Sequence, residues 1–323
     1  MMPVHDNENW TIHEIQVDSK TRFKIAVDRQ AEDPISEDYR NGRYTKTAVT
    51  DALLALFKPG MVVLDLGGHI GTITLAAAAR GCRVITVEAS PRNFALLSKS
   101  VETNGFDNVT LVHAAVSDAP GTLDFCAHGP WGHVYSSVTD MPTVSVRAVT
   151  VEQILSELDI DRVDLIKIDV EGSEVRAVRG MRKMLAAPDA PPVVYECNGH
   201  TLRFYDHTSQ EIRGAFADLG YQQYALEPPL LVPATADAPQ VGVLVDYLAT
   251  KQAPEIEGWR LGFEMTHDDM LTRARQYVGG SPEDRVHLAD EIQRSSLRNA
   301  PAFAAILRQL QQDEDESVRR AAA

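Results

Sequence analysis

The sequence feature that most constrains the fold is residues 62–71, which read Val-Val-Leu-Asp-Leu-Gly-Gly-His-Ile-Gly. Its apolar start, with two β-branched valines, is typical of a buried strand, and Asp65 lies near the C-terminal end of that strand. A glycine-rich turn follows, and residues 70–80 show a helical pattern. A strand, a glycine turn and a helix in this order indicate a parallel α/β sheet that brings its main chain close to a nucleotide ligand.

The glycines of this turn distinguish between ligand classes. A dinucleotide-binding turn needs a glycine two residues after its first, whereas this chain has His69 two residues after Gly67. The pattern therefore argues against a nicotinamide oxidoreductase. Asp-x-Gly-Gly-x-x-Gly, which ends at Gly71, is instead similar to the glycine-rich turn of S-adenosylmethionine-dependent methyltransferases.

A second buried strand is predicted at residues 83–88 and ends in Glu88. Glu88 follows the turn at about the separation at which an acid reaches an adenosine ribose. Together with "VITVEASPRNFALL", "HAAVSDAPGTL" and "IDVEGSE", the turn makes residues 44–246 resemble the FkbM family of methyltransferases. The most specific of these segments is "IDVEGSE". One departure is Gly68-His69, where the family usually has Ala-Asn.

The resemblance implies a Rossmann-like, seven-stranded methyltransferase sheet with helices on both faces, and S-adenosylmethionine as the cofactor. It also implies that Asp65 holds the amino-acid end of the cofactor, that Glu88 holds the ribose and that Ala115 forms a wall for the adenine. The glycines would let the backbone approach, because no Cβ intervenes. The residues expected to bind the cofactor are Asp65, Gly67, Gly68, His69, Gly71, Glu88, Ala115 and Asp169.

Acidic residues end two neighbouring core strands of the predicted sheet. Ligands gather at the carboxyl ends of parallel strands, so Asp169 and Glu196 are candidate catalytic residues, with His200 as a third. Asn198 points the same way as Glu196 if the strand continues. Two carboxylates and an amide oxygen suit Mg²⁺, so Asp169, Glu196 and Asn198 form one hypothesis, a metal site. A general base acting without metal is the other hypothesis.

Three parts are predicted along the chain. Residues 1–46 hold a β-hairpin and a lid, with breaks at Pro34 and Asn41-Gly42. Residues 47–250 form the cofactor-binding methyltransferase domain, and their first helix, up to Phe57, covers the sheet or forms a lid. Residues 251–323 carry three helix-sized apolar stripes, which must bury against the core or against a second subunit. A homodimer through these helices is therefore one expectation.

Several finer expectations concern the later part of the chain. Residues 109–116 read as one strand, and three short β pieces follow before residue 150. Between these pieces lies a loop with His128 and His133 that could shape a substrate pocket. One helix is expected over residues 174–185 and a loop over residues 228–240, while the last dozen residues are expected to fray.

Composition narrows the choice of partners and compartment. The net charge is −15, from 31 basic and 46 acidic residues, without the basic clusters that a nucleic-acid binder uses against phosphate. Cys82, Cys126 and Cys197 are widely spaced and are expected to be free buried thiols. There is no signal-like N-terminus and no long uncharged apolar run, so a soluble, cytoplasmic protein is expected.

The leading functional hypothesis is an O-methyltransferase that acts on a hydroxyl of a small molecule or glycosyl group, as the resemblance suggests. A methyltransferase for nucleic acid or protein is the alternative. Base N-methylation commonly uses Asn/Asp-Pro-Pro-aromatic after the fourth strand, where this chain has Asp-Val-Glu-Gly. A module that binds the cofactor without chemistry is a third class, and it would not need the acids at the strand ends.

Overall fold

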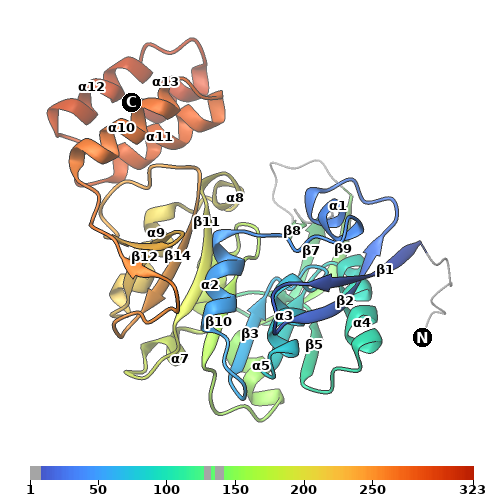
Figure 1. Ribbon diagram of the computed structural model, residues 1–323. Helices are drawn as coiled ribbons and strands as arrows, with labels where there is room; N and C mark the ends of the chain where they lie inside the picture. The colour runs from blue at the N-terminus through green and yellow to red at the C-terminus, as the bar shows by residue number, and fades with distance from the viewer. Residues whose placement is uncertain (1–8, 127–131, 135–141) are drawn as a thin grey trace.

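The computed structural model describes residues 9–126, 132–134 and 142–323. Within these residues a nine-stranded sheet crosses the molecule in the order β15-β13-β12-β14-β11-β10-β3-β4-β5 (Figure 1). Its strands are β3 (Val62–Leu66), β4 (Arg83–Glu88), β5 (Val109–His113), β10 (Leu165–Ile168), β11 (Val193–Asn198), β12 (Gln222–Glu227), β13 (Leu230–Ala234), β14 (Leu244–Thr250) and β15 (Arg260–Leu261).

The pairing directions confirm the predicted Rossmann-like methyltransferase sheet. The neighbours from β11 to β5 all pair in parallel, and β14 runs antiparallel to both β11 and β12. Two further strands, β13 and β15, extend the seven expected ones at one edge. Residues 228–240 are therefore not only a loop. Pro233 lies in β13, close to the edge of the sheet, where a missing backbone N–H is tolerated.

Helices cover both faces of the sheet, as predicted. Because side chains alternate along a strand, Val63 belongs to the core on one face, while Leu64 and Leu66 belong to the core on the other. The first face carries α2 (Ala48–Leu56), α3 (Thr72–Ala79) and α4 (Pro91–Asn104); the second carries α5 (Val151–Glu157), α6 (Glu174–Gly180), α7 (Arg182–Ala186) and α9 (Ser209–Asp218).

The N-terminal segment packs on the first face. The predicted hairpin is confirmed as β1 (Trp10–Gln16) and β2 (Arg22–Asp28), a two-stranded sheet separate from the main one. The expectation that Pro34 interrupts the chain is wrong, because Pro34 is the first residue of helix α1 (Pro34–Arg40). Asp33 caps this helix through Ser36 N–H at 2.8 Å. Proline suits the first turn of a helix, where its missing N–H has no partner to lose.

A smaller sheet lies beyond β5. It consists of β6 (Ala115–Val116), β7 (Gly121–Cys126), β8 (His133–Val134) and β9 (Thr143–Val149), in the order β6-β9-β7-β8. The expectation of one strand over 109–116 is wrong, because the chain changes partner at Ala114. Its N–H donates to the Glu88 carbonyl at 3.1 Å, and the next two residues pair with β9. His128 lies outside the described residues.

The single helix expected over 174–185 is also wrong, since it is divided into α6 and α7 at Met181. Gly180 lies directly against another segment, and a Cβ there would be 2.2 Å from the Ser117 carbonyl oxygen. The helix therefore meets the backbone of a neighbour at the point where it breaks. Glycine also has a low helix propensity, so the local sequence and the packing both favour an interruption.

The C-terminal part folds as a helical unit with its own core (Figure 1). The three predicted helices are confirmed as α10 (His267–Val278), α11 (Pro282–Arg294) and α12 (Pro301–Leu310). A further helix, α13 (Glu316–Ala322), replaces the expected frayed end, because Val318 and Ala322 are fully buried in that core. The short α8 (Gly199–Arg203) faces this unit from the end of β11.

Among the helices of the described residues, none has both the length and the apolar composition that crossing a bilayer requires.

We predict that two glycines with the same backbone conformation differ sharply in tolerance. Gly60 and Gly67 have φ of +84° and +83°, but a Cβ at Gly67 would lie 1.7 Å from the Asp169 carbonyl oxygen, whereas at Gly60 it would meet nothing within 4 Å. Gly60→Ala should cost about 1 kcal/mol of unfolding free energy from strain alone. Gly67→Ala should cost about 1–3 kcal/mol more. Urea unfolding measures both costs, and equal costs would contradict the close approach.

Candidate active site

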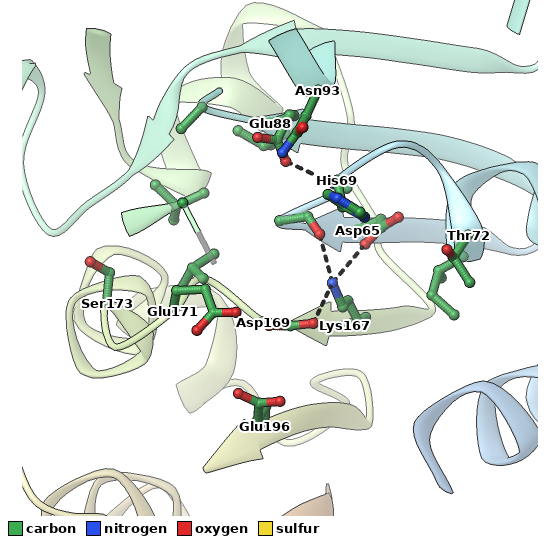
Figure 2. Close-up of a pocket in the computed structure, with 18 of the residues that line it drawn as sticks. Asp65, His69, Thr72, Glu88, Asn93, Lys167, Asp169, Glu171, Ser173 and Glu196 are labelled. Atoms are coloured by element: carbon green, nitrogen blue, oxygen red, sulfur yellow. Dashed lines mark hydrogen bonds and ion pairs between the residues drawn. The ribbon is translucent and has the colours of Figure 1, made fainter. Parts of the chain in front are cut away.

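A cavity of about 350 Å³ opens at the carboxyl ends of β3, β4, β10 and β11. Parallel strands bring these ends to one edge of the sheet, so side chains far apart in sequence meet there. Figure 2 shows that carboxylates and one lysine surround this space. The charged groups and the histidine in its lining are Asp65, His69, Glu88, Lys167, Asp169, Glu171, Glu196 and Asp246.

Lys167 lies at the centre of these charges, and the sequence reasoning had missed it. Its side chain is 6% exposed, and its Nζ donates to the Gly67 carbonyl at 2.7 Å. The ammonium also lies 3.5 Å from Asp65 Oδ1 and 3.3 Å from Asp169 Oδ2 (Figure 2). Burial acts to lower the pKa of Lys167, but the attraction of Asp169 and Asp65 outweighs it and raises the pKa above its ordinary value. The lysine is therefore charged and fixed.

Asp65 is fully buried and depends on this cation. Thr74 Oγ1 donates to its Oδ2 at 2.6 Å, while Oδ1 accepts no hydrogen bond from the described residues and faces Lys167. Burial raises the pKa of Asp65, and Lys167 opposes that shift. A lysine inside the otherwise apolar strand Leu165–Ile168 was the sequence signal for this pair, because a buried charge requires a partner.

The glycine turn is tied to the end of β4 by Glu88. Its two carboxylate oxygens accept the backbone N–H groups of His69 and Ser90, each at 2.7 Å. Burial raises the pKa of Glu88 to about 7, against these two hydrogen bonds. His69 adopts a left-handed conformation, with φ of 49°, and burial lowers its pKa to about 4. The imidazole is therefore neutral at physiological pH.

Close packing explains why this turn needs glycine. A Cβ at Gly68 would lie 2.2 Å from Thr86 Cγ2, and at Gly71 it would lie 2.8 Å from Leu97 Cδ1. Gly71 also has φ of +110°, which side chains rarely adopt. Room for the protein's own side chains thus accounts for these two glycines before any ligand is considered.

The loop after β10 turns Glu171 into the cavity. Glu171 and Gly172 both have left-handed φ, of 51° and 96°. Glu174 holds the loop in this shape, because its Oε1 accepts the N–H groups of Val170 and Gly172, each at 3.1 Å. Strained backbone of this kind occurs often at functional sites. Glu171 was not among the predicted site residues; an acid directly before a glycine at a strand end was the available signal.

Glu171 joins Asp169 and Glu196 in an acidic cluster. One carboxylate oxygen from each of the three lies within 4.8 Å of the others. Burial raises the pKa of Glu171 and of Glu196, and repulsion from Asp169 raises both further. Asp246, on β14, borders the same end of the cavity, and burial raises its pKa to about 7. These groups can hold protons at neutral pH, or they can receive a cation.

The predicted site residues separate into two sets. Those that line the cavity are Asp65, Gly67, Gly68, His69, Glu88, Ala115, Asp169 and Glu196. Gly71, Asn198 and His200 do not line it. Asn198 Oδ1 instead accepts the His200 N–H at 3.0 Å and so caps α8. The cluster therefore holds Glu171 at the position expected for Asn198.

The N-terminal segment closes one side of the cavity. Ile35 of α1 and Thr45, Thr47 and Thr50 around the start of α2 belong to its lining. Thr47 caps α2 reciprocally with Thr50. His133, which was expected in a loop, lies in β8 of the smaller sheet and is buried, with its ring centroid 5.3 Å from that of Phe204. It is not part of the lining, although its neighbours Gly132 and Val134 are.

This strand order, with a cavity over the carboxyl ends of the first four core strands, defines the class as a Rossmann-like methyltransferase fold. The family model described as the methyltransferase FkbM domain matches residues 65–222, so this part of the chain is similar to that domain. A comparison with curated protein sequences finds no match.

Solved structures of methyltransferases and related proteins are similar over much of the chain. Precorrin-6y C5,15-methyltransferase from Geobacter metallireducens GS-15 is 15% identical, with a TM-score of 0.38, over 64% of this chain and 87% of that one. TYW2 from M. jannaschii in complex with AdoMet is 10% identical, with a TM-score of 0.35, over 77% and 87%. Trm5b from Pyrococcus abyssi is 12% identical, with a TM-score of 0.38, over 76% and 56%.

We predict that Glu88 makes the stability depend on pH. Its pKa rises from 4.5 to about 7 on folding, so between these values the folded protein keeps a proton that the unfolded chain releases. Stability contributed by this group therefore falls as pH rises through that window. In Glu88→Gln the loss of unfolding free energy between pH 5 and pH 8 should be smaller by on the order of 3 kcal/mol.

Urea unfolding at the two pH values measures this difference. The control for the substitution itself is Glu102→Gln, at an exposed position of α4, the helix that follows β4. An unchanged pH dependence in Glu88→Gln would contradict the raised pKa.

Proposed function

We propose that this chain transfers the methyl group of S-adenosylmethionine to a hydroxyl of a small molecule or glycosyl group. The observation that carries the proposal is the division of one cavity into two halves. The glycine turn with Glu88 borders one half, and the acidic cluster of Asp169, Glu171 and Glu196 borders the other. The match of residues 65–222 to the methyltransferase FkbM domain supports the same reaction class.

The first half suits the cofactor. Glu88 is a buried carboxylate that could accept the ribose hydroxyls, and Ala114, Ala115 and Val116 offer an apolar wall for adenine. Asp65 also belongs to the lining, and a cationic amino group of the cofactor would share its carboxylate with Lys167, which lies 3.5 Å from Oδ1. The cofactor would supply an activated methyl group on its sulfonium. The protein's main task is then alignment of donor and acceptor, which can be worth about 7–11 kcal/mol.

The second half suits a hydroxyl acceptor. A hydroxyl is a poor nucleophile at neutral pH, so it needs a group that takes its proton as the methyl group arrives. Asp169, Glu171 or Glu196 could take this proton directly. Burial and repulsion from Asp169 raise the pKa of Glu171 to about 9 and the pKa of Glu196 well above its ordinary value, so either glutamate would accept the proton only in its ionised form.

A divalent cation is the other way to activate the hydroxyl. The three carboxylates supply the hard oxygen ligands that Mg²⁺ prefers, with Glu171 taking the place expected for Asn198. A bound cation would also relieve the repulsion among these groups. It would lower the pKa of a coordinated hydroxyl, so that no separate strong base is needed.

The acidic surroundings bear on the competing functions. A net charge of −15 and an acid-lined acceptor half disfavour a polyanionic nucleic acid. A protein acceptor stays as the alternative. A module that only binds cofactor would have no use for the buried carboxylates in the acceptor half. The cytoplasmic location, the three-part division at residues 46 and 250 and the homodimer through the C-terminal helices stay predictions.

Cofactor binding is the first test of this function. The purified protein should bind S-adenosylmethionine and its demethylated product in calorimetry, and it should not bind NAD. Glu88→Ala should weaken binding by about tenfold or more, because a charge-assisted contact to the ribose is lost. Glu102→Ala is the matched control on α4. NAD binding without a response to either sulfur nucleoside would overturn the assignment.

The second test separates a metal from a direct base. Labelled cofactor and a panel of glycosides and small alcohols, read by mass spectrometry, would identify an acceptor. Asp169→Asn, Glu171→Gln and Glu196→Gln keep shape while removing charge. Cofactor affinity should survive in the two glutamate variants, whereas Asp169 also pairs with Lys167, so the activity of its variant is read together with its measured cofactor affinity. If a metal acts, chelation should abolish turnover, Mg²⁺ should restore it, and all three variants should lose activity.

If a direct base acts, the chelator should have no effect. One of the three variants should then dominate, with a loss of roughly 10²–10⁴-fold in rate. Near-normal turnover in all three variants would exclude these acids from the chemistry.

A further inference from the structure

A buried ion pair joins the C-terminal helices to the methyltransferase sheet. Glu291 of α11 is 2% exposed, and Arg213 of α9 is 1% exposed, with Nη2 of the arginine 3.4 Å from the carboxylate. Ser209 Oγ and the backbone N–H of Gln240 also donate to Glu291, the latter at 2.8 Å. Neither charge reaches water, so each depends on the other and on these hydrogen bonds.

Gln240 carries the connection into the strands beside the cavity. Its side-chain amide donates to the Cys197 carbonyl at 3.0 Å, and its Oε1 accepts the Tyr247 hydroxyl at 3.2 Å. Cys197 follows Glu196 on β11, and Tyr247 follows Asp246 on β14. The residues tied to Gln240 are thus the direct neighbours of two carboxylates in the cavity lining.

A second residue of α11 contacts the same region, where β11 ends and β14 begins. His287, one turn before Glu291, is 3% exposed, and its Nε2 lies 3.0 Å from the Gly242 carbonyl oxygen. Its ring packs against Gly199, where a Cβ would lie 2.2 Å from Nδ1. Gly199 N–H in turn donates to the Val243 carbonyl at 2.7 Å. Helix α11 therefore packs against the residues at which β11 ends and β14 begins.

The helical unit contacts the segments next to β11 and β14, two strands that supply residues of the cavity lining. No described residue after Thr250 lines the cavity, and α11 lies beyond the family match at 65–222. A surface attachment would need no buried charges, since exposed ion pairs hold two surfaces together at lower cost. The buried network instead fixes one geometry, because each of its groups has a specified partner.

We propose that Glu291 is a positioning residue for methyl transfer. Through Arg213 and Gln240 it fixes the ends of β11 and β14, and thereby it sets where Glu196 and Asp246 face the acceptor. The C-terminal helices are then part of the catalytic unit. This inference rests on the proposed function, because only methyl transfer makes that half of the cavity the acceptor half.

The thiol of Cys197 can report on whether the ends of β11 and β14 stay closed to reagents in solution. This thiol is fully buried next to Glu196, and Cys82, directly before β4, is equally buried in the core on the other face of the sheet. In full-length Glu291→Gln, iodoacetamide should label Cys197 at least about tenfold faster than in the wild type, because local opening exposes it. The labelling rate of Cys82 should stay unchanged. Glu283→Gln, at an exposed position in the first turn of α11, is the matched control.

Two further measurements separate positioning from general stability. The affinity for S-adenosylhomocysteine should stay within about twofold of the wild type, while kcat with the acceptor found in the panel should fall by about tenfold or more. An equal rise in the labelling of Cys82 and Cys197 would indicate global destabilisation and would overturn the proposal. An unchanged labelling rate of Cys197 would overturn it as well. A normal kcat in a variant whose Cys197 is labelled faster would do the same.

These outcomes are distinct from a failure of the proposed function. The labelling and binding measurements need no acceptor, so they report on the ends of β11 and β14 even if the panel yields no methylated product. A wild-type protein that binds the cofactor but methylates nothing in the panel would count against the hydroxyl acceptor. The labelling of Cys197 would still decide whether Glu291 fixes the ends of β11 and β14.

Discussion

The interaction on which the rest of the site depends is the buried contact of Lys167 with Asp65, Asp169 and the Gly67 carbonyl. A lysine at this depth is strongly unfavourable unless anions surround it. The parallel pairing of β10 with β3 puts Lys167 directly opposite Asp65, so the sheet register itself supplies the partner. Register, charge pairing and the position of the glycine turn are therefore one constraint, and none of them can change alone.

Around this cation the protein accumulates carboxylates whose burial is unfavourable for folding. Burial raises the pKa of Glu88, Glu171, Glu196 and Asp246, which means that folding makes their charged forms less favourable. Two apolar cores, one on each face of the sheet, provide the stability that offsets this cost. Perturbed pKa values gather at functional sites for this reason, and here they gather around a single cavity.

Much of the architecture follows from local pattern. The strand at residues 83–88 has the expected bounds, because an apolar run ends in an acid, and Ser90-Pro91 then starts α4 in the preferred order of cap and first turn. Two of the errors occur where a segment meets a neighbour that its local pattern does not reveal. At Ala114 one apolar run serves two sheets, and at Gly180 contact with Ser117 coincides with a break in a continuous helical pattern. Hydrophobic periodicity contains no information about which neighbour a segment meets.

The sequence by itself determined the order of elements, the glycine turn and the acids at the strand ends, because these depend on residues close together in the chain. Only the tertiary structure decided which of them share a cavity. It brought Glu171 to Asp169 and Glu196 through a left-handed turn, and it gave Asn198 to the cap of α8. It also buried Glu291 against Arg213, since a long-range ion pair depends on how two distant helices pack and not on either local pattern.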